Sequence, residues 1–66
     1  MPEIADMMQL VGREITLRFA DNGITGRLER VETHPWGAVL HITSRIGTHY
    51  VPFPGAVMQV VIPLPE

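Results

Sequence analysis

Three histidines, His34, His41 and His49, are the side chains of this 66-residue chain that suggest metal chemistry. A zinc site needs three or four ligands, and the sequence places no third ligand beside any two of these. His41 and His49 share a face if the turn between them has three residues, and lie on opposite faces if it has two. We therefore expect no metal and no cofactor. Histidines titrate near neutral pH and could make an assembly pH-sensitive.

The sequence pairs no nucleophile with a general base. Ser44 is the only serine, the histidines stand at no informative spacing, and cysteine is absent. Glu29 and Glu32 are three residues apart, so on a regular strand they point to opposite faces. No glycine-rich phosphate loop is present. We expect a protein that is not an enzyme.

Positive charge comes from five arginines, and the formal net charge is −2. Nucleic-acid binders are usually basic, so binding here would need a local arrangement, multiplied by symmetry. Arginine binds phosphate in a bidentate manner and stacks on bases, whereas arginines on solvated strand faces form only weak ion pairs. Trp36, the only tryptophan, lies in a predicted loop. It is either a lid or subunit contact, or a surface that stacks on bases.

These side chains are positioned by one helix and five strands. Residues 2–11 are predicted to be helical, with Pro2 at the first position and Gly12 after the end. An apolar stripe at i, i+3, i+4 and i+7 would face the strands. Its members are Ile4, Met7, Met8 and Val11.

The strands are recognised by alternating apolar residues between turn signals. A tight turn is expected at 21–23, a loop at 33–37 and a turn at 45–47. In the second strand, Gly26 suggests a bend. Ile24 and Leu28 would lie on one face of a regular strand and Val31 on the other, which suggests a bulge near Glu29 and Arg30. The predicted strands are 14–20, 24–32, 38–44, 48–53 and 56–62.

Residues 1–66 are thus predicted to form a single mainly-β domain, a short helix followed by a strongly bent five-stranded antiparallel SH3-like or OB-like barrel. The fifth strand is apolar on both faces apart from Gln59, so one face would line the core and the other would pair with a neighbour. A chain this small without disulfides is commonly stabilised by self-association. No transmembrane helix and no signal peptide are recognisable, and we expect a cytoplasmic protein.

The order of these features resembles the Sm-like family, which includes bacterial Hfq. Leu10-Val11-Gly12 followed by Ile15, Leu17 and Phe19 is similar to the opening of its first strand. Asn22-Gly23, then Gly26 and Leu28, is similar to its turn and second strand, and residues 56–61 to its closing strand. The resemblance implies an Sm-type barrel in a homo-oligomeric ring of six or seven subunits, in which the fourth strand pairs with the fifth strand of the next subunit. The expected interface residues are Val51, Val57, Gln59 and Val61.

The resemblance also implies binding of single-stranded RNA, although the family's base-contacting polar residues are replaced. Glu32 stands where the family usually has Asp, and Phe53-Pro54-Gly55 stands where Hfq has Tyr-Lys-His. We expect Trp36 and Phe53 to stack on bases, with Arg45, His49 and Tyr50 beside them. The alternative is a small-barrel protein-interaction or scaffold module that does not bind RNA.

Overall fold

The computed structural model describes residues 3–62, so the predicted helix start at Pro2 and the chain end at residues 63–66 lie outside the described residues. The predicted mainly-β class with one short helix is confirmed. The elements are α1 (Ile4–Met8), β1 (Glu14–Arg18), β2 (Gly23–His34), β3 (Gly37–Ser44), β4 (Gly47–Phe53) and β5 (Gln59–Val61).

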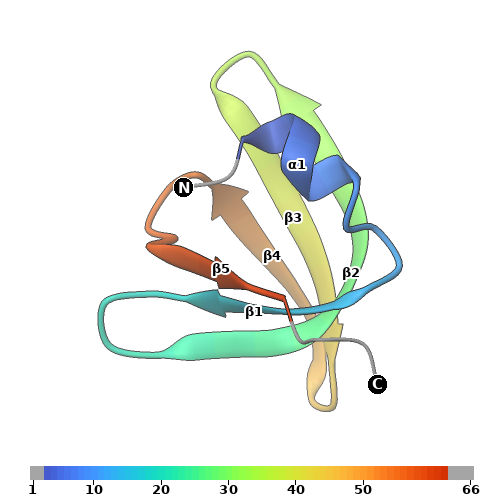
Figure 1. Cartoon of the computed structure of the whole chain (residues 1–66), viewed down its shortest axis with the longest axis vertical. Helices are drawn as coiled ribbons and strands as arrows, with labels where there is room; N and C mark the ends of the chain where they lie inside the picture. The colour runs from blue at the N-terminus through green and yellow to red at the C-terminus, as the bar shows by residue number, and fades with distance from the viewer. Residues whose placement is uncertain (1–2, 63–66) are drawn as a thin grey trace.

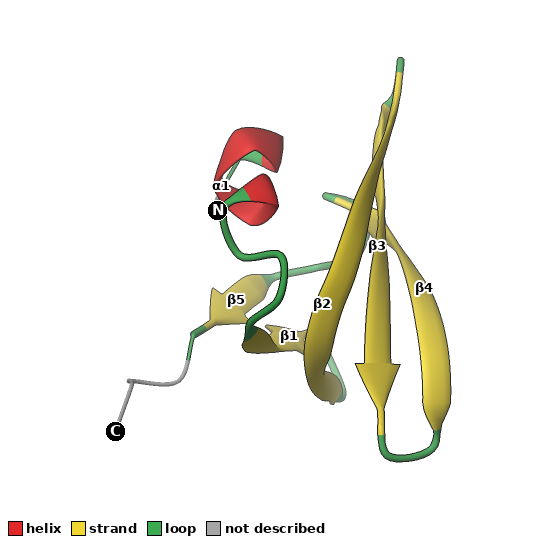
Figure 2. Cartoon of the chain, turned by 90° about the vertical axis from the view of Figure 1, so that its right-hand side faces the viewer, coloured by secondary structure: helices red, strands yellow, loops and turns green. Residues whose placement is uncertain are grey.

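The five strands form one open antiparallel sheet in the order β4-β3-β2-β1-β5. β4 and β5 are therefore the two edge strands, and within residues 3–62 they do not pair with each other. β1, β5 and the first part of β2 run across the direction of β3 and β4 (Figure 1), and Figure 2 shows the two groups from the side. β2 bends between the groups and belongs to both.

The predicted bulge in β2 is confirmed. Leu28 pairs with Ile42 and Arg30 pairs with His41, so the register shifts at the residue between Leu28 and Arg30. Beyond the bulge, Val31 pairs with the buried Leu40 and packs against the core. The extra residue thus returns the apolar side chains of β2 to the inner face of the sheet.

Both hairpin turns that border β3 are shorter than predicted. His34 pairs with Gly37, so the turn contains only Pro35 and Trp36, and the predicted loop over 33–37 is wrong. Ser44 pairs with Gly47, so the second turn contains only residues 45 and 46. The central residues of both turns have negative φ, and the glycine that follows each turn has the positive φ, 149° at Gly37 and 135° at Gly47.

The short second turn decides the relation between two of the histidines. His41 pairs with Tyr50, and His49 pairs with the buried Ile42. Because partners in a ladder share a face, His41 lies on the outer face of the sheet and His49 on the inner face.

Two predicted strands are too long. β1 ends at Arg18, because the Phe19 N–H donates to the Asn22 carbonyl oxygen at 2.7 Å and starts a turn. β5 covers only three residues instead of 56–62. There the Val57 N–H donates to the Pro54 carbonyl at 2.9 Å, so a turn occupies the expected start of the strand.

The helix is also shorter than predicted, and its apolar stripe differs. After Met7 the backbone tightens: the Leu10 N–H donates to the Met7 carbonyl at 3.0 Å, an i to i+3 bond. Three residues per turn place Leu10 instead of Val11 below Met7. Leu10 is 7% exposed, whereas Met8 and Val11 are 47% and 46% exposed. The predicted stripe is therefore wrong at Met8 and Val11.

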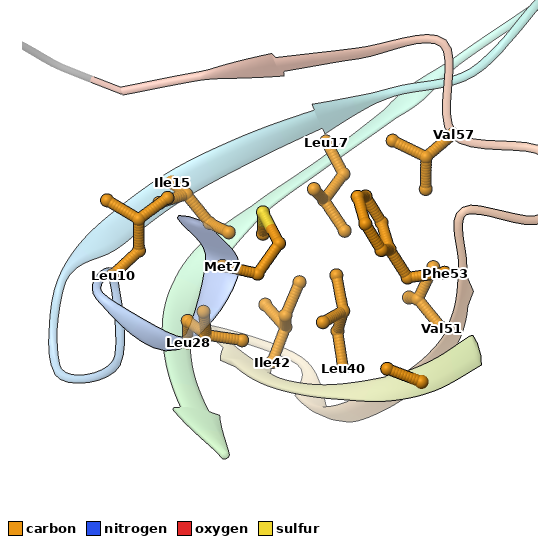
Figure 3. Close-up of a cluster of buried hydrophobic side chains, with 11 residues drawn as sticks. Met7, Leu10, Ile15, Leu17, Leu28, Leu40, Ile42, Val51, Phe53 and Val57 are labelled. Atoms are coloured by element: carbon orange, nitrogen blue, oxygen red, sulfur yellow. The ribbon is translucent and has the colours of Figure 1, made fainter. Parts of the chain in front are cut away.

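The core lies between α1 and the inner face of the bent sheet (Figure 3). Among residues 3–62, no buried polar or charged residue interrupts it. No helix in this range is long and apolar enough to span a membrane. The buried side chains are Met7, Leu10, Ile15, Leu17, Leu28, Ala38, Leu40, Ile42, Val51, Phe53 and Val57.

Candidate functional site

Polar and aromatic side chains form a continuous line of contacts on the outer face of β2, β3 and β4. Alternation places Glu32 and His34 on the same face of β2, and the register brings His41 of β3 and Tyr50 of β4 beside each other. The β2–β3 turn adds Trp36 at one end. We call Glu32, His34, Trp36, His41 and Tyr50 the outer-face cluster.

Glu32 lies at the centre of this cluster, between the two imidazoles. Its Oε2 is 2.6 Å from Nε2 of His34, and its Oε1 is 3.4 Å from Nε2 of His41. The hydrogen bond from His34 lowers the pKa of the Glu32 carboxyl below its ordinary 4.5, partial burial opposes this, and Arg30 and His41 add to the lowering. The carboxylate is therefore held ionised and oriented by its neighbours.

The contact with His41 is incomplete. Nε2 of His41 is buried and has no hydrogen-bond partner among residues 3–62, because the 3.4 Å approach to Glu32 does not have hydrogen-bond geometry. In the same range, no group of three or more His, Asp or Glu side chains is arranged to hold a metal ion. Both imidazoles instead direct Nε2 at the one carboxylate.

Each imidazole also contacts an exposed aromatic ring. The His34 and Trp36 rings stack at a centroid distance of 4.9 Å and an interplanar angle of 4°. The His41 and Tyr50 rings meet edge to face at 4.9 Å. Trp36 is 62% exposed and Tyr50 is 66% exposed. The cluster thus holds two aromatic surfaces in fixed orientations while leaving both open to solvent.

The predicted RNA-binding residues do not form one site. Trp36 adjoins the start of β3, whereas Arg45 follows its end, eight residues of strand away. An extended strand of that length spans about 26 Å. Figure 1 shows these two turns at opposite ends of the molecule. The expectation that Arg45 and His49 lie beside Trp36 is therefore wrong.

Phe53, Val51 and Val57 also differ from their expected roles. Phe53 is 2% exposed and pairs with Ala38, so its ring fills the core and is not available to stack on a base. Val51 and Val57 are 7% and 4% exposed and pack in the same core, so they are not available as interface residues. Gln59 and Val61, the other two predicted interface residues, are exposed on β5.

The structure pairs Ser44 with His49, which the sequence analysis missed. Ser44 Oγ lies 2.8 Å from His49 Nε2, 3.2 Å from the Gly47 carbonyl oxygen and 3.3 Å from the Ile46 nitrogen. A hydroxyl satisfies all three contacts when it accepts from Ile46 and from His49 Nε2–H and donates to Gly47. In that arrangement the imidazole does not act as a base, and the hydroxyl braces the turn.

An open pocket of about 270 Å³ adjoins this turn. Residues 23–25 of β2 form one wall, and Ser44, Arg45, Ile46 and His49 form the other. Arg45 and His49, which were predicted to contact RNA, both line this pocket, and His49 lies on the opposite face of the sheet from Tyr50.

Part of the outer-face cluster carried a signal in the sequence. Glu32 and His34 are two residues apart in a predicted strand, which places them on one face. The contact between Glu32 and His41 depends on the bulge and on the length of the β2–β3 turn, and no spacing in the sequence reveals it.

Comparison with known proteins adds no relative. No family model, no curated protein and no solved structure matches this chain.

Proposed function

We propose that this chain is a divergent Sm-like protein that assembles into a homo-oligomeric ring and binds single-stranded RNA through the outer-face cluster. The observation that carries the proposal is that the outer-face cluster holds two exposed aromatic rings, the Trp36 indole, which stacks on His34, and the Tyr50 ring. Single-stranded nucleic acids bind proteins largely by stacking bases on such aromatic side chains. The proposal includes a cytoplasmic location.

The two open edges of the sheet support assembly. The two-residue turn makes Ser44 and Gly47 a hydrogen-bonded pair, so Thr48 and Tyr50 direct their main-chain groups away from β3. Pro52 is two residues after Tyr50, so its nitrogen also points away from β3, and the missing N–H removes no hydrogen bond from the sheet. The β4 edge is therefore free to accept another strand.

β5 supplies a suitable partner strand in a second copy. Val61 and Ile62 are 37% and 42% exposed, and Met58 just before the strand is 67% exposed. Pairing of β5 with β4 of a neighbour would cover these apolar side chains and remove both edges. Repeated around a ring, this pairing would close the small SH3-like barrel across subunits. The resemblance to Sm-like proteins sets the expected number at six or seven.

Fluorescence tests the RNA-binding proposal directly, because Trp36 is the only tryptophan. Oligo-U and oligo-A titrated into the protein at low salt should quench its emission, and anisotropy of labelled RNA should report the same affinity. Added salt should weaken binding. No binding to either oligomer at micromolar protein and low salt would contradict the proposal.

A pair of variants locates the binding face. Trp36→Leu should weaken binding of labelled RNA about fivefold or more, since stacking contributes about 1–3 kcal/mol per base. Ile46→Ala removes a side chain that is 88% exposed in the opposite turn and should bind RNA like the wild type. Equal loss in both variants would place the RNA elsewhere.

The open β4 edge also favours a second candidate function, a scaffold module that binds an extended peptide by adding a strand. The net charge of −2 is compatible with this alternative. The ratio of absorbance at 260 and 280 nm of the purified protein separates the two, because co-purified RNA raises it. A pull-down that recovers proteins and no nucleic acid would favour the scaffold.

A further inference from the structure

The charge of the outer-face cluster depends on two imidazoles. β2 contributes Arg30, Glu32 and His34, β3 contributes His41 opposite Arg30, and β4 contributes the Tyr50 phenol. With neutral imidazoles, the guanidinium and the carboxylate balance. With both imidazoles protonated, this face carries an excess of two positive charges.

Both imidazoles can gain a proton while they stay beside the Glu32 carboxylate. His34 places Nε2 2.6 Å from the Glu32 carboxylate, so Nε2 of its neutral ring carries the hydrogen and protonation occurs at Nδ1. The buried Nε2 of His41 lies 3.4 Å from the same carboxylate without a hydrogen bond. Neither Nδ1 takes part in a hydrogen bond within residues 3–62. Protonation therefore adds an N–H donor to each ring and strengthens its attraction to the carboxylate. For His34 it also adds a cation–π contact with the stacked indole.

We propose that protonation of His34 and His41 switches the outer-face cluster into a phosphate-binding state, so that single-stranded RNA binds tightly in mildly acidic solution and weakly at slightly alkaline pH. This inference rests on the proposed RNA-binding function and adds its regulation. Phosphates would contact the imidazolium N–H groups and Arg30 while bases stack on Trp36 and Tyr50.

The composition supports the same switch. The formal net charge is −2 with neutral histidines and +1 with all three protonated. Phosphate neutralisation supplies most of the non-specific affinity for nucleic acids, so an acidic chain binds poorly unless it gains charge. Histidine is the side chain that gains charge between pH 8 and pH 5. Two of the three histidines lie beside the exposed aromatic rings.

Anisotropy of labelled oligo-U at pH 5.5 and pH 7.5 tests the inference. We expect binding about tenfold tighter at pH 5.5, the size expected of two exposed charge pairs. The slope of log K against log salt should steepen by about 1.4, or about 0.7 for each added phosphate contact.

Three variants assign the effect. His34→Gln and His41→Gln should each reduce the pH dependence, and the double variant should abolish it. His49→Gln serves as the matched control, because it replaces an imidazole that lies on the inner face of the sheet. It should keep the wild-type pH dependence. Circular dichroism and light scattering at both pH values verify that each variant retains its fold and assembly.

A second readout needs no RNA. Trp36 emission in the free protein should change between pH 7.5 and 5.5 as His34 gains its proton, and His34→Gln should remove the change. RNA binding of equal strength and salt slope at both pH values would overturn the switch and leave the proposed function standing. No binding at either pH would overturn both. A pH dependence that survives in the His34→Gln/His41→Gln variant would also overturn the switch.

Discussion

Gly26 and Thr43 approach so closely across β2 and β3 that a methyl group at Gly26 would lie 2.5 Å from the Thr43 carbonyl oxygen. The same methyl group would lie 2.8 Å from a methyl carbon of Ile42. Both obstacles belong to β3, the strand paired with this part of β2, so the sheet can accommodate a side chain at Gly26 only by shifting its backbone.

Gly26→Ala should therefore destabilise the fold by about 2 kcal/mol, which is typical of overpacking. Gly23→Ala in the same strand should cost less, because its methyl group would lie 3.0 Å from the Leu17 carbonyl oxygen, a tight contact but a longer one. Urea unfolding of both variants at one protein concentration measures the difference. Equal stability of the two variants would show that β2 and β3 do not approach as described.

Met7 and Met8 are adjacent but differ in burial, at 0% and 47% exposed. Met7→Ala should lower the free energy of unfolding by about 3 kcal/mol, because it leaves a cavity between α1 and the sheet. Met8→Ala should change it by no more than about 0.5 kcal/mol. Chemical unfolding followed by circular dichroism compares them. A larger loss at Met8 would indicate that α1 is rotated.

The lowered pKa of Glu32 predicts how stability depends on pH. A carboxyl whose pKa is lower in the folded state stabilises the fold above the unfolded value. This contribution is lost as pH falls below about 4.5 and through the lower folded-state pKa. The melting temperature of Glu32→Gln should consequently fall less than that of the wild type between pH 5 and pH 3.

Glu14→Gln is the control for this measurement, because Glu14 is an exposed carboxyl at the start of β1. It should retain the wild-type fall in melting temperature. If Glu32→Gln and the wild type lose the same number of degrees, the hydrogen bond between Glu32 and His34 does not contribute to acid stability.

Substitutions at Tyr50 test assembly through the β4 edge. Tyr50→Pro removes an N–H that points away from β3, so the chain should keep its fold but lose the donor needed by a neighbouring strand. Tyr50→Thr removes the same ring and keeps the N–H. Light scattering should give the 7.4 kDa monomer mass for Tyr50→Pro and an oligomer for Tyr50→Thr. Oligomers of equal mass in both would exclude β4 as the interface.

Much of the sheet was predictable because its signals are local. Alternation identified the strands, and the parity break between Leu28 and Val31 indicated the bulge that the register confirms. The predicted end of the helix was wrong because i to i+3 hydrogen bonds after Met7 change the spacing of the buried side chains from four residues to three. That change is set by how α1 packs, which the helical pattern alone does not contain.

The candidate site was less predictable because its contacts join different strands. Trp36 and Tyr50 were expected to be functional and are exposed, but their contacts with His34 and His41 follow from strand register. Phe53 was assigned a surface role by resemblance, whereas its pairing with Ala38 places it in the core. Whether His41 and His49 share a face was left open by the sequence, and the two-residue turn between Ser44 and Gly47 places them on opposite faces.

The length of β2 has a consequence for how the molecule unfolds. Its first residues pair with β1 and the remainder with β3, so neither part of the sheet has a complete set of hydrogen bonds without the other. The buried side chains of β1 share one core with those of β3 and β4, so melting of the β3–β4 hairpin would expose the side chains of β1 to solvent. We therefore expect a single cooperative transition, in which amide protons in β1 and β3 exchange with solvent through the same global opening.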